Sequence, residues 1–175
     1  MLRSAWRLWV VLAVQLLIVA AVPGKKLAAM FSSVEITLET RPYDPYDVLS
    51  GYYVTLRYEA EVVPPGLLSD DLVSGDTAWI LLTKDTPAWR VVSVSPRRPT
   101  SGANDVVLEA TWDGSWARLD NLRKFYISEA ARDDVARAMA KTNGRGYVDA
   151  KVGPNGDAVL IRLRVGDKVF GCARH

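Results

Sequence analysis

The sequence predicts an α+β fold that is mainly antiparallel β, barrel-like or a sandwich, with one helix and an N-terminal transmembrane helix. Three observations lead to this class. Apolar and polar residues alternate with a period of two in several short segments, beginning with residues 33–40. Glycine, proline and aspartate cluster between those segments, as expected for turns that connect neighbouring strands. A long apolar run stands near the N-terminus, before the first alternating segment.

The apolar run predicts a membrane anchor. It reads LWVVLAVQLLIVAAV over residues 8–22, and with the three residues before it the run spans 18 residues, about the shortest helix that crosses a ~30 Å hydrocarbon core. Trp6 and Trp9 stand near its start, where indole rings favour the membrane interface. We therefore expect residues 1–26 to form the anchor and its flanks, with the lipid bilayer contacted through residues 5–22. A cleaved signal peptide and a buried helix of a soluble protein are the alternatives.

The charge distribution places the rest of the chain. The sequence has 22 Lys and Arg against 20 Asp and Glu, a formal net charge of +2. Four of the basic residues flank the apolar run, and subtracting them leaves 18 basic against 20 acidic residues. This excludes the basic surface that nucleic acid requires, so no nucleic-acid partner is expected. The basic N-terminal tail favours a cytoplasmic N-terminus. Residues 27–175 are therefore expected to form one β-rich domain on the extracytoplasmic (periplasmic) side of a cell membrane that the chain crosses once.

The expected strands follow the alternating segments in order. Val34, Ile36 and Leu38 alternate with polar residues, and a second alternation runs through residues 52–63. Short turn signals separate the later strands, and Asp113-Gly114 is the strongest hairpin signal among them. The expected strands are 33–40, 52–63, 77–83, 89–95, 106–112, 147–152 and 158–165, with shorter extended pieces at 116–119, 124–127 and 169–170.

One helix is expected after the extended piece at 124–127. Ser128 is a favourable N-cap, and Asn143-Gly144 is a typical end of a helix. Its apolar stripe consists of Ala131, Val135, Ala138 and Met139.

The chain is poor in the residues that most catalytic and metal sites require. Cys172 is the only cysteine, so no disulfide forms within these residues, and His175 is the only histidine. No catalytic, cofactor-binding or metal-binding residue is expected, and no cofactor. We interpret the paired aspartates as solvated surface acids; they are Asp44 and Asp47, Asp70 and Asp71, and Asp133 and Asp134.

A short motif carries a resemblance to a known family. Residues 51–58 read GYYVTLRY, which matches the octet G-D-Y-x-x-L-x-Y except at Tyr52, where aspartate is expected. Farther on, KFYISE at 124–129 looks like an R-F-Y-V-P-E element, and the segments 146–148 and 154–158 resemble a closing hairpin. The chain thus resembles the GDYXXLXY family of bacterial membrane-associated proteins over nearly its whole length. The matching motif residues are Gly51, Tyr53, Leu56 and Tyr58.

The resemblance implies a partner but carries over no biochemical activity. Members of the family are often encoded beside a multi-pass membrane protein of unknown function, and such a protein is the partner that the resemblance implies. If the aspartate replaced by Tyr52 is functional in the family, this protein lacks that function.

The motif residues themselves have a structural interpretation. Gly51 is expected to turn the chain into the strand. Leu56 and Tyr58 share one face of that strand, whereas Tyr53 has the opposite parity, which implies a bulge or a strand buried on both faces. We therefore expect these residues to build the sheet.

Three tyrosines form the candidate interaction surface. Tyr43, Tyr46 and Tyr52 are chosen because loop aromatics beside proline are difficult to bury together. We expect a membrane-anchored, non-enzymatic domain of the bacterial envelope that is an accessory or interaction partner of a multi-pass membrane protein. The alternatives are an envelope module that binds an unknown small molecule in an aromatic groove, and a carboxylate-dependent hydrolase.

Overall fold

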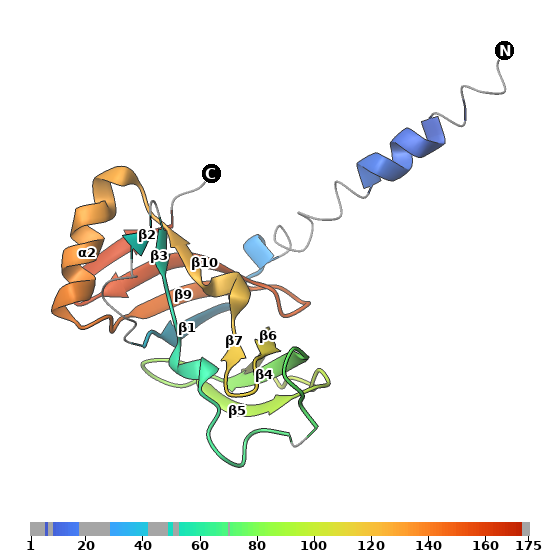
Figure 1. Cartoon of the computed structure of the whole chain (residues 1–175), viewed down its shortest axis with the longest axis horizontal. Coiled ribbons are helices and arrows are strands. Elements are labelled where there is room, and N and C mark those ends of the chain that lie inside the picture. Colours follow the sequence, from blue (N-terminus) through green and yellow to red (C-terminus); the bar gives the residue numbers. More distant parts are fainter. Residues whose placement is uncertain are drawn as a thin grey trace.

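The computed structural model describes residues 6, 9–17, 29–41, 49–50, 53–69 and 71–172 (Figure 1). Its strands are β1 (Glu35–Glu39), β2 (Leu49–Ser50), β3 (Tyr53–Thr55), β4 (Thr77–Thr83), β5 (Arg90–Ser95), β6 (Asp105–Trp112), β7 (Ala117–Arg118), β8 (Lys124–Tyr126), β9 (Tyr147–Val152), β10 (Ala158–Val165) and β11 (Lys168–Gly171). Its helical segments in the same part of the chain are the 3₁₀ turns η1 (Glu59–Glu61), η2 (Asp120–Leu122) and η3 (Glu129–Ala131), and the α-helix α2 (Arg132–Lys141).

The strands form three sheets, and every ladder in them is antiparallel. The sheets have the strand orders β1-β9-β10-β11, β2-β3-β8 and β5-β4-β6-β7. The prediction of a mainly antiparallel β fold is therefore confirmed. Strands β4, β9 and β10 begin and end at the residues that the alternation predicts.

One hydrophobic core is built from the inward faces of these sheets. The period-two alternation decides which side chains enter it: Ile36 and Leu38 are buried, as are Ile80 and Leu82, while their neighbours face outward. Helix α2 closes one end of the β1-β9-β10-β11 sheet (Figure 1) and contributes the buried side chains Val135, Ala138 and Met139.

Two backbone contacts join the sheets at their margins. The amide of Trp89 donates to the carbonyl of Thr37 at 2.9 Å, which attaches the start of β5 to the free edge of β1. The amide of Glu109 in β6 donates to the carbonyl of Gly156 at 3.1 Å, which attaches the β9–β10 turn to β6. The turn between β9 and β10 is thus also a tertiary contact.

The expected strand over residues 52–63 is wrong in its second half. Strand β3 covers only Tyr53–Thr55, Tyr58 makes an isolated bridge with Thr40, and the chain then turns into η1. The cause is Glu61, whose carboxylate accepts the amide hydrogen of Tyr58 at 3.1 Å. This bond, the return half of a capping box, stabilises a helical turn where the alternation predicts extended chain.

The helix begins differently from the prediction and ends as predicted. Its first turn is the 3₁₀ segment η3, and the side chain of Ser128 makes no capping hydrogen bond. At the other end Asn143 and Gly144 both have positive φ, and the Gly144 amide donates to the carbonyl of Met139 at 2.8 Å. This geometry is typical of a helix that ends in a left-handed turn.

The N-terminal segment contributes a short helix over residues 9–17, which lies apart from the β-rich body (Figure 1). No helix within the described residues is long and apolar enough to cross a membrane. The expected span, residues 5–22, falls partly outside those residues, so the transmembrane helix stays a prediction.

The β9–β10 turn permits only glycine at residue 156. Gly156 has a φ of +86°, a conformation that side chains with a Cβ rarely adopt. A Cβ there would lie 2.9 Å from Cζ3 of Trp79 and 3.2 Å from the amide nitrogen of Glu109. The turn therefore packs against β4 and β6 so closely that there is no room for a side chain at residue 156.

We predict that Gly156→Ala lowers the free energy of unfolding by about 2–5 kcal/mol, because backbone strain and overpacking against Trp79 add together. Gly166→Ala is the matched control for strain alone, since Gly166 has a φ of +56° and open space around it. Gly171→Ala should cause neither backbone strain nor overpacking, since Gly171 has no positive φ and open space around it. Urea denaturation should rank the losses Gly156 > Gly166 > Gly171, and equal losses at Gly156 and Gly166 would contradict the close packing.

Candidate functional site

Two motif residues hold the segment between β7 and β8. The Tyr58 side chain is completely buried, and its hydroxyl donates to the carbonyl of Leu122 at 2.7 Å. The amide of Leu56 donates to the carbonyl of Arg123 at 2.8 Å, and its side chain is also buried. Both therefore place residues 122–123 against the core.

Glu61 completes this attachment from the other side. Its Oε1 accepts the amide hydrogen of Leu119 at 2.9 Å, while Oε2 holds the amide of Tyr58. Burial raises the pKa of the Glu61 carboxyl, although these two bonds and the nearby Arg123 favour the ionised form. Burial, with the charge of Glu61 beside it, also raises the pKa of the Tyr58 hydroxyl. We refer to Tyr58, Glu61 and the backbone that they hold at 119–122 as the motif clamp.

Tyr53 lies on the other side of β3 and forms a surface aromatic pair. It is opposite Tyr126 in the β3–β8 register, and the two ring centroids are 5.9 Å apart. The ammonium of Lys124 lies 4.8 Å from the Tyr53 ring centroid, within the range of a cation–π contact. Tyr53 thus faces the side of β3 opposite to Val54, which is fully buried.

The candidate interaction surface of the sequence analysis stays a prediction. Tyr43, Tyr46 and Tyr52 lie outside the described residues, as does Gly51 of the motif. Tyr53 is the next residue in the chain after Tyr52, and Tyr126 lies opposite Tyr53 in the sheet. No signal in the sequence marks Tyr126 as a surface residue.

A polar pocket opens beside the motif clamp. It encloses about 190 Å³. The guanidinium groups of Arg41 and Arg57 lie 5.3 and 5.8 Å from the ring centroid of Trp116, which forms part of its wall. The lining residues are Arg57, Glu61, Asp113, Trp116, Arg118 and Arg123.

Acidic partners balance much of the positive charge at this pocket. Asp120 pairs with Arg118 at 3.1 Å and with Arg123 at 3.8 Å. Glu59 pairs with Arg41 at 3.5 Å. The pocket can therefore receive a small polar molecule, but these ion pairs compete with a purely anionic one.

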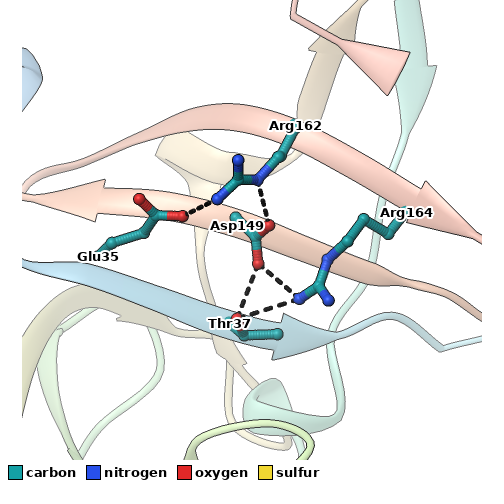
Figure 2. Close-up of polar contacts among 5 residues, drawn as sticks. All are labelled: Glu35, Thr37, Asp149, Arg162 and Arg164. Carbon is teal, nitrogen blue, oxygen red and sulfur yellow. Dashed lines mark hydrogen bonds and ion pairs between the residues drawn. The ribbon is translucent and has the colours of Figure 1, made fainter. Parts of the chain in front are cut away.

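A second polar cluster crosses the sheet on its outward face (Figure 2). Asp149 of β9 lies opposite Thr37 of β1 and opposite Arg162 of β10, so the three form one row across three strands. Asp149 Oδ1 accepts from the Thr37 hydroxyl and from Nη2 of Arg164, each at 2.7 Å, and Oδ2 accepts from Nε of Arg162. Arg162 continues the row to Glu35, with which it forms an ion pair.

A β-bulge makes this row. Strict alternation from the buried Leu160 would turn Arg162 and Arg164 into the core. The register instead shifts between Leu160 and Arg162, which puts Arg162 opposite Asp149 and returns Leu163 to the core. The bulge therefore keeps both guanidinium groups on the outward face.

The row favours the ionised form of Asp149. Burial of its side chain opposes ionisation, but hydrogen bonds from Arg162, Thr37 and Arg164 outweigh burial and hold the pKa below its usual value. No signal in the sequence marks this site. Its members are far apart in the chain, since Thr37 and Asp149 are 112 positions apart, and no local pattern joins them.

The expected acidic pairs and the cysteine do not form a reactive cluster in the described part of the chain. There, no three His, Cys, Asp or Glu residues are placed to hold a metal ion. Asp134 is paired with Arg137 at 2.8 Å and with Lys168 at 3.2 Å. Cys172 is half-buried after β11, and burial raises its pKa. Asp44, Asp47 and Asp70 lie outside the described residues.

The fold and these clusters define a class: a small antiparallel β domain in which buried polar side chains secure turns and strands. The chain belongs to the GDYXXLXY family, because the family model described as GDYXXLXY protein matches residues 15–163. No curated protein and no solved structure matches the chain.

We predict that Tyr58→Phe destabilises the protein by about 1–3 kcal/mol, because it leaves the buried carbonyl of Leu122 without the hydroxyl that it accepts from. Tyr53→Phe is the matched control: it removes a hydroxyl from another motif tyrosine, in β3 at a half-exposed position, and should change stability by less than about 0.5 kcal/mol. Urea denaturation measures both. Equal effects would show that the Tyr58 hydroxyl does not hold Leu122.

We predict that Asp149→Asn lowers stability by about 2 kcal/mol near neutral pH, because an amide cannot accept the same three hydrogen bonds. Since the folded pKa of Asp149 lies below the unfolded value, its contribution is complete above about pH 4 and is lost as the pH falls through the folded pKa. The difference between wild type and variant should therefore shrink in acid. Asp134→Asn, at an exposed ion pair, is the control and should have little effect.

Proposed function

We propose that this chain is a membrane-anchored, non-enzymatic domain of the bacterial envelope that serves as an accessory or interaction partner of a multi-pass membrane protein. The anchor is residues 1–26, with residues 5–22 in the bilayer. The domain is residues 27–175, a barrel-like or sandwich arrangement on the periplasmic side.

The observation that carries the proposal is the exposed helix over residues 9–17. Its seven large apolar side chains, from Trp9 to Leu17, are 44–72% exposed, and no side of the helix is covered. Apolar surface in water costs about 25 cal/mol per Å². A helix that is apolar on all sides is stable in lipid or against other apolar helices, which supports both a bilayer anchor and contact with a partner's transmembrane helices.

The polar groups of the domain support a binding role. Three titratable side chains with shifted pKa values hold the backbone or neighbouring strands; they are Tyr58, Glu61 and Asp149. By contrast, the aromatic pair of Tyr53 and Tyr126 faces the surface beside the family motif, and a half-exposed aromatic pair is a typical anchor of a protein interface.

A second candidate function is a ligand-binding module, favoured by the pocket at Trp116. Its stacked guanidinium groups and its volume of about 190 Å³ suit a small polar molecule. One aromatic residue, Trp116, lines this pocket, and the other lining residues are arginines and acids, so it is more polar than the aromatic groove that the sequence suggested.

The test of the accessory role is a pull-down of the full-length protein from detergent-solubilised bacterial membranes. We expect a stoichiometric multi-pass partner, reduced about tenfold or more when residues 1–26 are deleted. A variant with an unrelated apolar helix in place of the anchor separates membrane placement from specific helix contact. Tyr53→Ala should weaken capture several-fold, whereas Val73→Ala, at an exposed apolar residue of another loop, should not.

Recovery of the full-length protein alone would contradict the accessory role. Small-molecule screening that follows Trp116 fluorescence would then test the second candidate, with Trp116→Phe as the spectroscopic control. Capture that is unchanged by deletion of residues 1–26 would place the contact wholly in the domain.

A further inference from the structure

An apolar patch lies where the domain begins, directly after the proposed anchor. Phe31 is 85% exposed, the highest value for any large apolar side chain in the described residues, and Met30 and Val34 beside it are 45% and 42% exposed. Three exposed apolar side chains within five residues form a surface that water does not favour. We refer to Met30, Phe31 and Val34 as the entry patch.

The entry patch is held in place by the domain. Ala29 is fully buried against Gly153, where a Cβ added to the glycine would lie 3.1 Å from the Ala29 Cα. The amide of Val152 donates to the carbonyl of Val34 at 3.0 Å, which extends the β9 ladder past β1. The patch is therefore presented by a fixed turn on the sheet, and its exposure follows from the fold.

Cationic side chains lie beside the patch. The ammonium of Lys151 donates to the carbonyl of Met30 at 3.3 Å. Arg98 lines an open groove of about 270 Å³ together with Val34, and Asp105 is the acidic residue in that lining. The Asp105 carboxylate accepts the amide hydrogen of Gly102, so it is already engaged in its own turn.

We propose that the entry patch rests in the interfacial layer of the bilayer, with Lys151 and Arg98 at the phosphate groups of anionic lipids. This inference rests on the proposed anchor. Six residues separate Val22, the end of the expected span, from Ala29, so Ala29, directly before the patch, lies at most about 25 Å along the chain from the hydrocarbon boundary. An aromatic side chain with neighbouring cations is the composition that the membrane interface favours.

The proposal also fixes the orientation of the domain. A single flexible tether would let the domain turn freely, whereas a second contact through Phe31 holds it at one angle to the membrane. The side of the domain that carries the entry patch, at the β9–β10 turn and residues 29–34, then faces the lipid. The opposite end, closed by α2, faces away from it (Figure 1).

The test uses the full chain in lipid nanodiscs, with Cys172→Ser to remove the native thiol. Nitroxide labels on single cysteines report depth through their accessibility to oxygen and to a water-soluble nickel chelate. The label positions are Leu12→Cys in the proposed anchor, Ser33→Cys beside the patch, and Val73→Cys on a loop that is equally open to water. We expect the label at 33 to be several-fold less accessible to nickel than the label at 73, and Phe31→Asp to abolish that difference.

The outcomes separate the two proposals. If the label at 12 lies in the bilayer and the label at 33 is as accessible to nickel as the label at 73, the anchor stands and the entry-patch proposal is overturned. If the label at 12 is accessible to nickel, the anchor itself fails. Nanodiscs of phosphatidylglycerol and of phosphatidylcholine test the contacts of Lys151 and Arg98 with anionic lipid. Lower nickel accessibility of the label at 33 in phosphatidylglycerol supports these contacts, and equal accessibility in the two lipids overturns them. Melting curves of each variant establish that it is folded.

Discussion

One buried carboxylate decides the path of the chain around the family motif. Glu61 accepts an amide hydrogen from Tyr58 in its own turn and another from Leu119, which is 58 positions away. Burying a charge is unfavourable, and the raised pKa of Glu61 reflects this. Two charge-assisted bonds offset that cost only where both backbone amides meet the same carboxyl group. Because extended chain would carry Glu61 away from Tyr58, the strand has to end there, and the motif becomes the junction between β3, β7 and β8.

The second polar cluster, around Asp149, joins three strands on the outward face of a sheet, as Glu61 joins two segments at the core. Both use a carboxylate to join segments that are distant in the chain, but their settings differ. Asp149 is covered by the guanidinium groups that it binds, and its pKa falls, whereas Glu61 is covered by the core and its pKa rises. The bulge after Leu160 is the structural condition for the Asp149 cluster, since without it Arg162 and Arg164 would point into apolar surroundings.

In the proposed membrane placement, the N-terminal part of the chain sets the orientation of the domain relative to the bilayer. The exposed apolar helix before it and the exposed Phe31 at its entry differ in one respect: the helix makes no contact with the body, whereas the turn that carries Phe31 is attached to it through Ala29 and Gly153. If the helix is the proposed anchor, a tether followed by a fixed contact limits rotation, and limited rotation would help the domain to present one surface to the proposed membrane-protein partner. On this view the aromatic pair of Tyr53 and Tyr126 is available to a partner, because it belongs to the β2-β3-β8 sheet and not to the entry patch.

The sequence by itself determined the local structure of this protein. Alternation and turn residues together located β4, β9 and β10 to the residue, Asp113-Gly114 marked the turn after β6, and Asn143-Gly144 marked the end of α2, because these signals act over a few neighbouring residues. The tertiary structure decided the rest: the end of β3 at Tyr58, the bulge in β10, the Asp149 row and the pocket at Trp116. Each of these depends on a contact between groups that are close in space and distant in the chain: Glu61 bonds to Leu119 as well as to Tyr58, and Asp149 bonds to Thr37. The energy of such a bond depends on the path of the backbone between the two, and a one-dimensional pattern of residues does not contain that path.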